Sequence, residues 1–109
     1  MITWEDFEKI DMRVGTILEV KEFEKARNPS YQLRIDFGTL GVKQSSAQIK
    51  ALYSMDELVG KQVIAVVNFP PKQIANFFSE CLVLGVYNSN QEVLLLQPSS
   101  PAGNGDKIG

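Results

Sequence analysis

The chain has 109 residues, with 11 Lys and Arg against 13 Asp and Glu, one Cys and no His. These counts suit one globular domain, residues 1–109, and exclude imidazole-based catalysis, an internal disulfide, and zinc sites built on His or on several thiolates. No apolar run reaches the roughly 20 residues of a membrane span and no basic stretch leads an apolar segment, so we expect no membrane insertion, no signal peptide and a cytoplasmic location.

A short helix is expected near the start of the chain. Thr3 can cap this helix, and Asp6 lies near the positive end of its dipole. Trp4, Phe7 and Ile10 recur at helical spacing, so they share one face. That apolar stripe packs either on the domain's own core or against a second subunit. We take Trp4, Phe7 and Ile10 as candidates for a homodimer interface.

Three strand patterns follow the helix. Residues 12–19 alternate in polarity, and Gly15 among them indicates a bulge or a sharp bend. Residues 31–38 alternate most cleanly, with Tyr31 and every second residue after it apolar. Residues 42–48 predict a third strand, which is unusually polar.

The second half of the chain adds a helix and further strands. Ser54 and Glu57 form a capping box for a short helix that Gly60 ends. Strands are predicted at residues 63–67, 82–84 and 93–96, the last two joined around Asn88–Asn90. This order favours an all-β fold, a five-stranded OB-type barrel with a short N-terminal helix, a helix between the third and fourth strands, and a C-terminal extension.

The polar third strand is the first candidate site. Ser45 and Ser46 could act as nucleophiles only with Lys43 as their base, because the chain has no His. They could also be small polar residues without a function. A third interpretation fits OB folds better, since these barrels bind extended ligands on a polar strand face.

Two aromatic segments are further candidates. The prolines after Asn68 and Phe69 stiffen residues 68–73, so this stretch is either a rigid turn or a ligand contact made by Asn68, Phe69 and Lys72. Phe77 and Phe78 cannot both point inward on a strand, so either one lies exposed or both cap the barrel from a loop. Cys81 has no basic neighbour in the sequence and is expected to be an inert, buried thiol.

Charge and motifs limit the remaining possibilities. The net charge of −2 disfavours bulk binding of nucleic acid, although residues 28–84 carry five Lys and Arg against four Asp and Glu, a sum of +1. The carboxylates of Asp36, Glu80 and Glu92 are scattered along the chain, so we expect no metal site. No phosphate-binding loop or dinucleotide motif is present, so no cofactor is expected.

Four ordered segments together resemble a known family. Residues 7–15, 43–49, 66–74 and 79–85 resemble the tRNA-binding-domain family of OB folds, and more narrowly its stand-alone CsaA-type chaperones. The resemblance implies a five-stranded barrel, a homodimer and no catalysis. It also implies a ligand-facing surface that includes Lys43, Ser45, Asn68, Lys72, Ser79 and Glu80. We add Phe69 to this surface from the argument on residues 68–73 above.

The same resemblance implies the partners. CsaA-type proteins are described as binding unfolded or pre-secretory polypeptides in protein export. The export machinery is therefore a further partner that the resemblance implies. The alternative is tRNA binding on the same OB-fold surface. The tRNA-binding appendages of synthetases carry Gly-Met after Ser-Glu, whereas this chain has Cys81-Leu82 after Ser79-Glu80. Losing the glycine removes a close backbone approach, which favours the chaperone interpretation.

Overall fold

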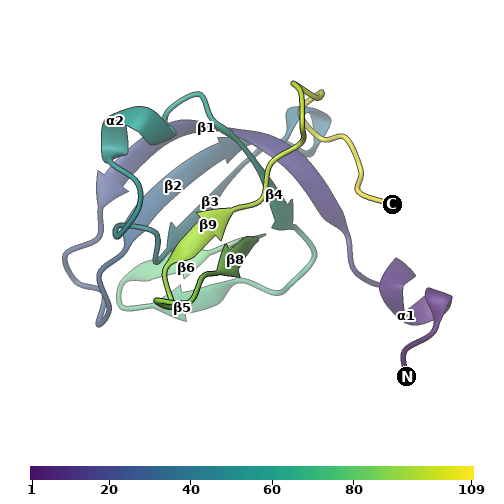
Figure 1. Ribbon diagram of the computed structural model, residues 1–109, viewed down its shortest axis with the longest axis horizontal. Coiled ribbons are helices and arrows are strands. Elements are labelled where there is room, and N and C mark those ends of the chain that lie inside the picture. The colour runs from purple at the N-terminus through teal and green to yellow at the C-terminus, as the bar shows by residue number, and fades with distance from the viewer.

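A five-stranded antiparallel sheet forms the centre of the computed structural model, which describes residues 1–109 (Figure 1). The strand order is β3-β2-β1-β4-β7, and the sheet curls into a nearly closed barrel. The strands are β1 (Met12–Glu22), β2 (Tyr31–Asp36), β3 (Val42–Ala47), β4 (Gln62–Val66) and β7 (Leu82–Val83). The predicted all-β, OB-like fold is therefore confirmed.

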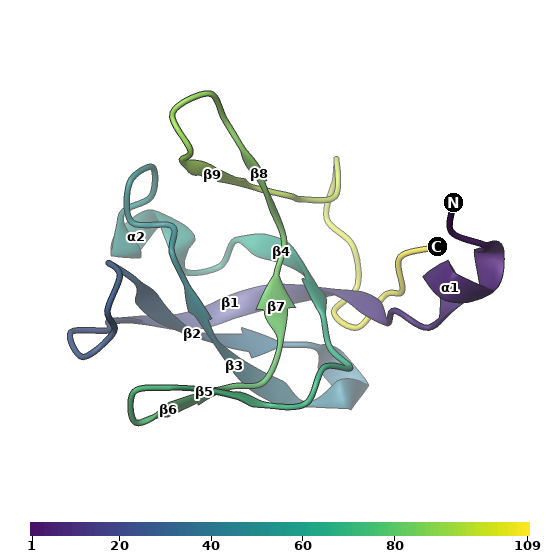
Figure 2. The ribbon, with the colours of Figure 1, turned by 90° about the horizontal axis from the view of Figure 1, so that it is seen from below.

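Two small hairpins and three short helical segments complete the chain. The hairpins pair β5 (Lys72–Ile74) with β6 (Phe77–Ser79), and β8 (Gly85–Tyr87) with β9 (Val93–Leu95). Figure 2 shows them at opposite ends of β7. The helical segments are α1 (Trp4–Glu8), the 3-10 turn η1 (Gly38–Leu40) and α2 (Met55–Leu58). No helix has the length and apolar character needed to cross a membrane.

The core follows the alternation of β2, as predicted. Tyr31, Leu33, Ile35 and Phe37 are all buried, while Arg34 on the opposite face is exposed. Side chains on a strand point alternately to its two faces, so one face of β2 supplies a continuous apolar row to the barrel interior. Residues from the other barrel strands, and Leu58 of α2, pack against this row.

Gly15 has a different role from the one predicted. The register of β1 against β2 shifts between Ile17 and Glu19, so the irregularity lies after Gly15. This shift explains why Ile17 and Val20, three residues apart, are both buried, against simple alternation. Gly15 itself is a close-packing position, because a Cβ added there would lie 2.6 Å from Cγ2 of Ile35.

The C-terminal arm, residues 104–108, pairs with the first half of β1. The Val14 amide donates to the Asp106 carbonyl (2.9 Å), the Gly105 amide to the Val14 carbonyl (2.7 Å), and the Ile108 amide to the Met12 carbonyl (2.9 Å). The first residues of β1 lie beyond its pairing with β2, which begins at Thr16. The arm therefore fills an edge that would otherwise be open.

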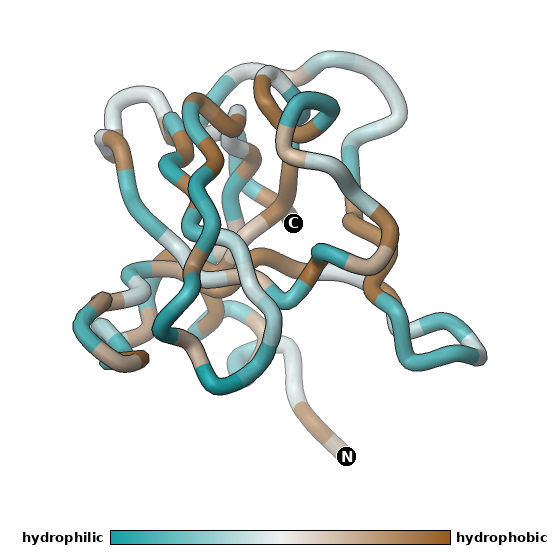
Figure 3. The backbone as a smooth tube through the Cα atoms, turned by 90° about the vertical axis from the view of Figure 1, so that its left-hand side faces the viewer, coloured by the Kyte–Doolittle hydropathy of each residue, from teal (hydrophilic) through white to brown (hydrophobic).

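Both predicted helix caps are present. Thr3 and Asp6 form a reciprocal capping box at α1, and Ser54 and Glu57 form another at α2. The two helices differ in packing, because Leu58 of α2 is fully buried whereas α1 buries no residue. Helix α1 lies apart from the barrel in Figure 1, and the apolar first residues extend away from it in Figure 3.

Candidate ligand-binding groove

The barrel closes between β3 and residues 79–81 largely through side chains. The Glu80 amide donates to the Gln44 carbonyl (2.8 Å), and the Gln44 amide donates back to Oε1 of Glu80 (2.9 Å). The Ser46 amide donates to Oγ of Ser79 (3.2 Å). Two side-chain oxygens thus accept the hydrogen bonds that a neighbouring strand would normally accept from this edge of β3.

Ser45 lies inside this junction. Its side chain has no exposed surface, and its hydroxyl donates to the Cys81 carbonyl at 3.1 Å. Oγ of Ser79 donates to the same carbonyl at 3.2 Å. Ser45 therefore holds the junction together and has no surface for a bound ligand in this structure. Its buried hydroxyl is also unavailable as a nucleophile.

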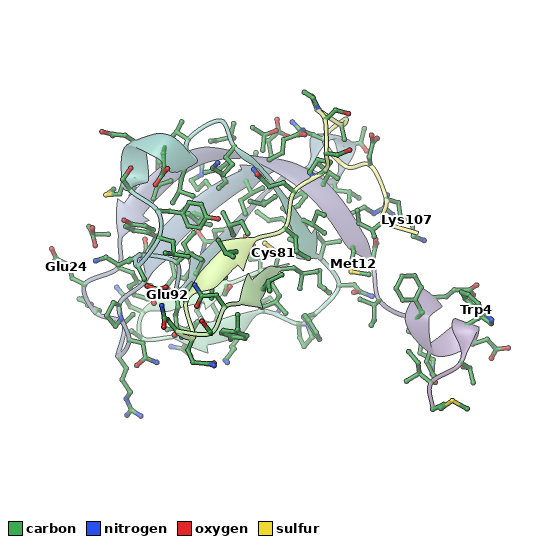
Figure 4. The ribbon with its side chains drawn as sticks, viewed as in Figure 1. Trp4, Met12, Glu24, Cys81, Glu92 and Lys107 are labelled. Atoms are coloured by element: carbon green, nitrogen blue, oxygen red, sulfur yellow. The ribbon has the colours of Figure 1, made fainter.

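Cys81 is the buried thiol that the sequence predicted. It sits within the barrel (Figure 4), and burial raises the pKa of its thiol to about 12, with a smaller opposing effect from the Ser45 hydroxyl. A thiol with so high a pKa stays protonated at neutral pH and does not act as a nucleophile or metal ligand. No group of three or more His, Cys, Asp or Glu side chains is arranged to hold a metal ion.

Next to this junction, β3 and β7 separate and leave a groove of about 650 Å³. Its walls come from the end of β3, both hairpins and β7, and ten of its lining residues are hydrophobic. The lining includes one cation, Lys72, and no carboxylate. The groove residues are Ser46, Ala47, Gln48, Ile49, Phe69, Pro70, Lys72, Ile74, Ser79, Cys81, Leu82, Val83, Leu84, Gly85, Tyr87, Gln91 and Val93.

The structure brings three of the proposed ligand-binding residues into the groove lining: Phe69, Lys72 and Ser79. Asn68 lies outside it and ties the start of the chain to the end of β4. Its Oδ1 accepts from the Asp11 amide (3.0 Å), and its Nδ2 donates to the Lys9 carbonyl (2.7 Å). Glu80 belongs to the barrel junction, and Lys43 precedes Gln44 in β3. Neither residue lines the groove.

Phe77 and Phe78 both lie in β6, and they differ in exposure. The ring of Phe77 packs against Phe23 with centroids 5.3 Å apart, whereas Phe78 is 51% exposed. Both lie on a strand rather than in a loop. Phe78 does not line the groove, and its carbonyl accepts a hydrogen bond from Nε2 of Gln44 (2.8 Å).

Sequence reasoning missed much of the groove wall. Ile49, Leu82, Tyr87 and Val93 line the groove but were not among the predicted site residues. They come from three separate parts of the chain. The polarity change after Ala47 and the turn at Asn88–Asn90 were the only local signals near them, and neither signal reports which strands face each other.

The apolar stripe of α1 has little packing within the chain. Trp4 is 86% exposed and Ile10 is exposed as well, while Phe7 is half-buried. The Trp4 side chain projects from the helix well away from the barrel (Figure 4). The first of the two alternatives, packing of this stripe on the domain's own core, therefore does not describe Trp4.

Comparison with known proteins identifies the family of this chain. The profile of the family described as "Putative tRNA binding domain" matches residues 12–107. The chain belongs to the tRNA-binding-domain family. Within this family it is similar over its whole length to solved structures described as CsaA chaperones. That of Picrophilus torridus is 56% identical, with full coverage of both chains and a TM-score of 0.95. That of Bacillus anthracis is 51% identical over 100% of this chain and 99% of the other, also with a TM-score of 0.95.

Other members of the family are parts of larger enzymes. The methionine–tRNA ligase of Chlorobium chlorochromatii is 35% identical over 107 residues, which is 98% of this chain and 15% of the ligase. The chain thus spans about 15% of the length of the curated relatives it matches. The family match and the chaperone structures together support a binding protein.

Proposed function

We propose that this protein is a non-catalytic chaperone of the CsaA type, a single domain of residues 1–109 that binds unfolded or pre-secretory polypeptides in the cytoplasm during protein export. The groove carries the proposal, because its lining is mostly apolar and holds one cation and no carboxylate. Unfolded polypeptides expose apolar side chains that such walls can remove from water. Similarity to CsaA chaperones along the full chain supports this class of ligand.

The proposed site residues divide into two roles. Phe69 and Lys72 contact the bound polypeptide, since both line the groove and Phe69 is 55% exposed. Ser45, Ser79 and Glu80 shape the groove from one end, because their hydrogen bonds hold β3 against residues 79–81. The remaining two, Asn68 and Lys43, take neither role and lie outside the groove lining.

A pair of matched variants tests the proposal. Phe69→Ala removes an exposed ring from the groove, and Phe78→Ala removes a similarly exposed ring outside it. In a light-scattering assay of a chemically unfolded client protein, Phe69→Ala should protect less well than the parent protein, and Phe78→Ala should protect equally well. Equal protection by both variants, or no protection by the parent at equimolar amounts, would contradict the chaperone function.

Binding of tRNA is the second candidate function. It is favoured by the family match and by the outer face of β2 and β3, where Arg34 is exposed and forms no salt bridge. OB folds commonly bind nucleic acid on this face. Retardation of tRNA that weakens steeply with salt, and that is lost in Arg34→Glu, would support it. If excess tRNA displaces a bound unfolded peptide, the two ligands share a surface.

We also propose a homodimer formed through the stripe of Trp4, Phe7 and Ile10. An apolar face that the chain leaves uncovered is a common sign of a subunit interface. Two grooves on one particle would increase avidity for a long polypeptide without any new contact. Sedimentation should give a dimer for the parent protein and a monomer for Trp4→Ser, while Glu8→Gln on the same helix should remain a dimer. A parent monomer at micromolar concentration would refute this interface.

A further inference from the structure

The edge of β3 that faces the groove offers unpaired main-chain groups. Residues of β3 pair with β2 on one side, while the amides of Gln44 and Ser46 point to the other side, where Glu80 and Ser79 accept them. Main-chain groups alternate in direction along an extended strand, so Gln48 is the next residue to face this way. Burial alternates through Ser45, Ala47 and Ile49, which indicates that the extended conformation continues past the end of β3.

No strand reaches this part of the edge. The side-chain acceptors from residues 79 and 80 extend only as far as Ser46. No protein group accepts the Gln48 amide. The only donor to the Ser46 carbonyl is the Ser45 hydroxyl at 3.2 Å, whose single proton is shared with the Cys81 carbonyl. Ser46 and Gln48 both line the groove. The groove lining therefore includes a short length of open strand edge.

The remaining lining suits the side chains of a strand placed there. Leu82, Tyr87 and Phe69 are exposed apolar or aromatic residues in the groove lining. A strand lying along β3 would direct alternate side chains toward such surfaces. Main-chain pairing together with pockets for alternate side chains is the general pattern of strand addition to a sheet edge.

Charge distinguishes a polypeptide from a nucleic acid in this groove. A nucleic acid strand carries a negative charge at each nucleotide, whereas the lining offers only the Lys72 ammonium to balance it. The absence of carboxylates and the single cation match an apolar segment that is neutral or carries one acidic group. This complementarity favours a polypeptide of that kind over an RNA strand.

We propose that an extended, apolar polypeptide segment binds by adding as a strand to the edge of β3 at Ser46–Gln48. This inference rests on the proposed chaperone function and specifies how that function is performed. Main-chain hydrogen bonds do not depend on the client's side chains, so this mode lets one small groove accept many sequences. The junction made by Ser45, Ser79 and Glu80 fixes where the added strand must end.

The first test observes the Gln48 amide directly. The probe is an acetylated and amidated peptide of about nine residues in which Leu alternates with Thr, with one Asp, a length typical of a strand. At saturation, hydrogen exchange of the Gln48 amide should slow by about tenfold or more, as expected for a newly paired group. The exposed Lys25 amide, which has no partner and lies outside the groove, is the control and should not change.

An unchanged Gln48 amide in a saturated complex would overturn strand addition while leaving polypeptide binding intact. A peptide and an unfolded client that both fail to bind would overturn the chaperone function itself. The two failures are therefore distinguishable.

The second test removes donors from the peptide. Two versions carry N-methyl groups on alternate amides, one on the odd and one on the even positions. Pairing with one edge predicts that one version loses affinity by about tenfold or more, while the other stays within about threefold of the parent peptide. Similar affinity for both versions, or equal loss in both, contradicts pairing with β3 alone.

Two protein variants complete the design. Gln48→Pro removes the amide donor at an exposed position and should weaken binding of the unmethylated peptide by about tenfold. Gln48→Ala keeps the donor and should bind like the parent. If Gln48→Pro does not fold, the hydrogen-exchange measurement on the parent protein still decides whether the peptide pairs with the Gln48 amide. Equal affinity of folded Gln48→Pro and Gln48→Ala would overturn the proposal.

Discussion

Replacing Gly15 with alanine tests whether close packing explains this glycine. An added Cβ would lie 2.6 Å from Cγ2 of Ile35 and 2.7 Å from Cε1 of Phe37. Carbon atoms in contact prefer separations of about 3.5–4.0 Å, so each contact would overlap by about 1 Å. Ile35 and Phe37 have no exposed surface, and neither can move aside without disturbing the rest of the core.

The expected magnitude follows from two opposing effects. Overpacking a core costs about 1–3 kcal/mol of unfolding free energy. Alanine also restricts the unfolded chain, which returns about 0.4–1 kcal/mol. We therefore expect Gly15→Ala to lower the free energy of unfolding by about 1–2 kcal/mol and the midpoint of thermal unfolding by about 5–15 °C for a chain of this size.

Urea and thermal unfolding followed by circular dichroism would measure both quantities. A double-mutant cycle supplies the control, because Phe37→Leu removes the ring that the new methyl group would meet. In that background, the cost of Gly15→Ala should be clearly smaller. The reasoning is refuted if Gly15→Ala is as stable as the parent protein, or if its cost is unchanged beside Leu at position 37.

Three further predictions concern a turn, a thiol and a cap. Ala75 has a φ of 54° in the β5–β6 turn, so Ala75→Gly should raise the free energy of unfolding by about 0.5–1 kcal/mol, while Asn76→Gly, which is not at positive φ, should not. Burial raises the Cys81 pKa from 9.0 to about 12, so its stabilising effect is complete below pH 9 and is lost as pH rises toward 12. The difference in unfolding free energy between the parent and Cys81→Ala should therefore shrink over that interval, and a constant difference would argue against a buried thiol. The Thr3 amide lowers the pKa of Asp6, so the α1 cap should persist below pH 3.8 and be lost on further acidification. The NMR shift of the Thr3 amide should titrate with a midpoint below pH 3.8. A midpoint at or above pH 3.8 would contradict the hydrogen bond between this amide and the Asp6 carboxylate.

Features set by neighbouring residues were predicted well. The Thr3 cap, the Ser54–Glu57 capping box and the alternation of β2 depend on residues within one turn or one strand, and all three are present. The buried Cys81 also followed from its surroundings in the sequence. Such signals are local, so one chain is enough to recognise them.

Features set by distant residues were not predicted. The hairpin β5–β6 has strands of three residues and follows Pro70 and Pro71, so its alternation is too short to recognise. The irregularity of β1 lies after Gly15 because of its register with β2. Ser45 looked like a ligand-facing residue on a polar strand, yet its hydroxyl belongs to a junction with Cys81, which is 36 residues away. Groove walls from residues 46 to 93 meet only after the barrel has formed.

The pairing of residues 104–108 with β1 has a consequence for biosynthesis. The Gly105 amide donates to the Val14 carbonyl, so the edge of β1 is completed only by residues that are translated after all the other strands of the barrel. Until then, the early edge stays available to other nascent chains. Contacts over such long sequence separations also slow folding. The first half of β1 is therefore open to mispairing throughout synthesis of the barrel.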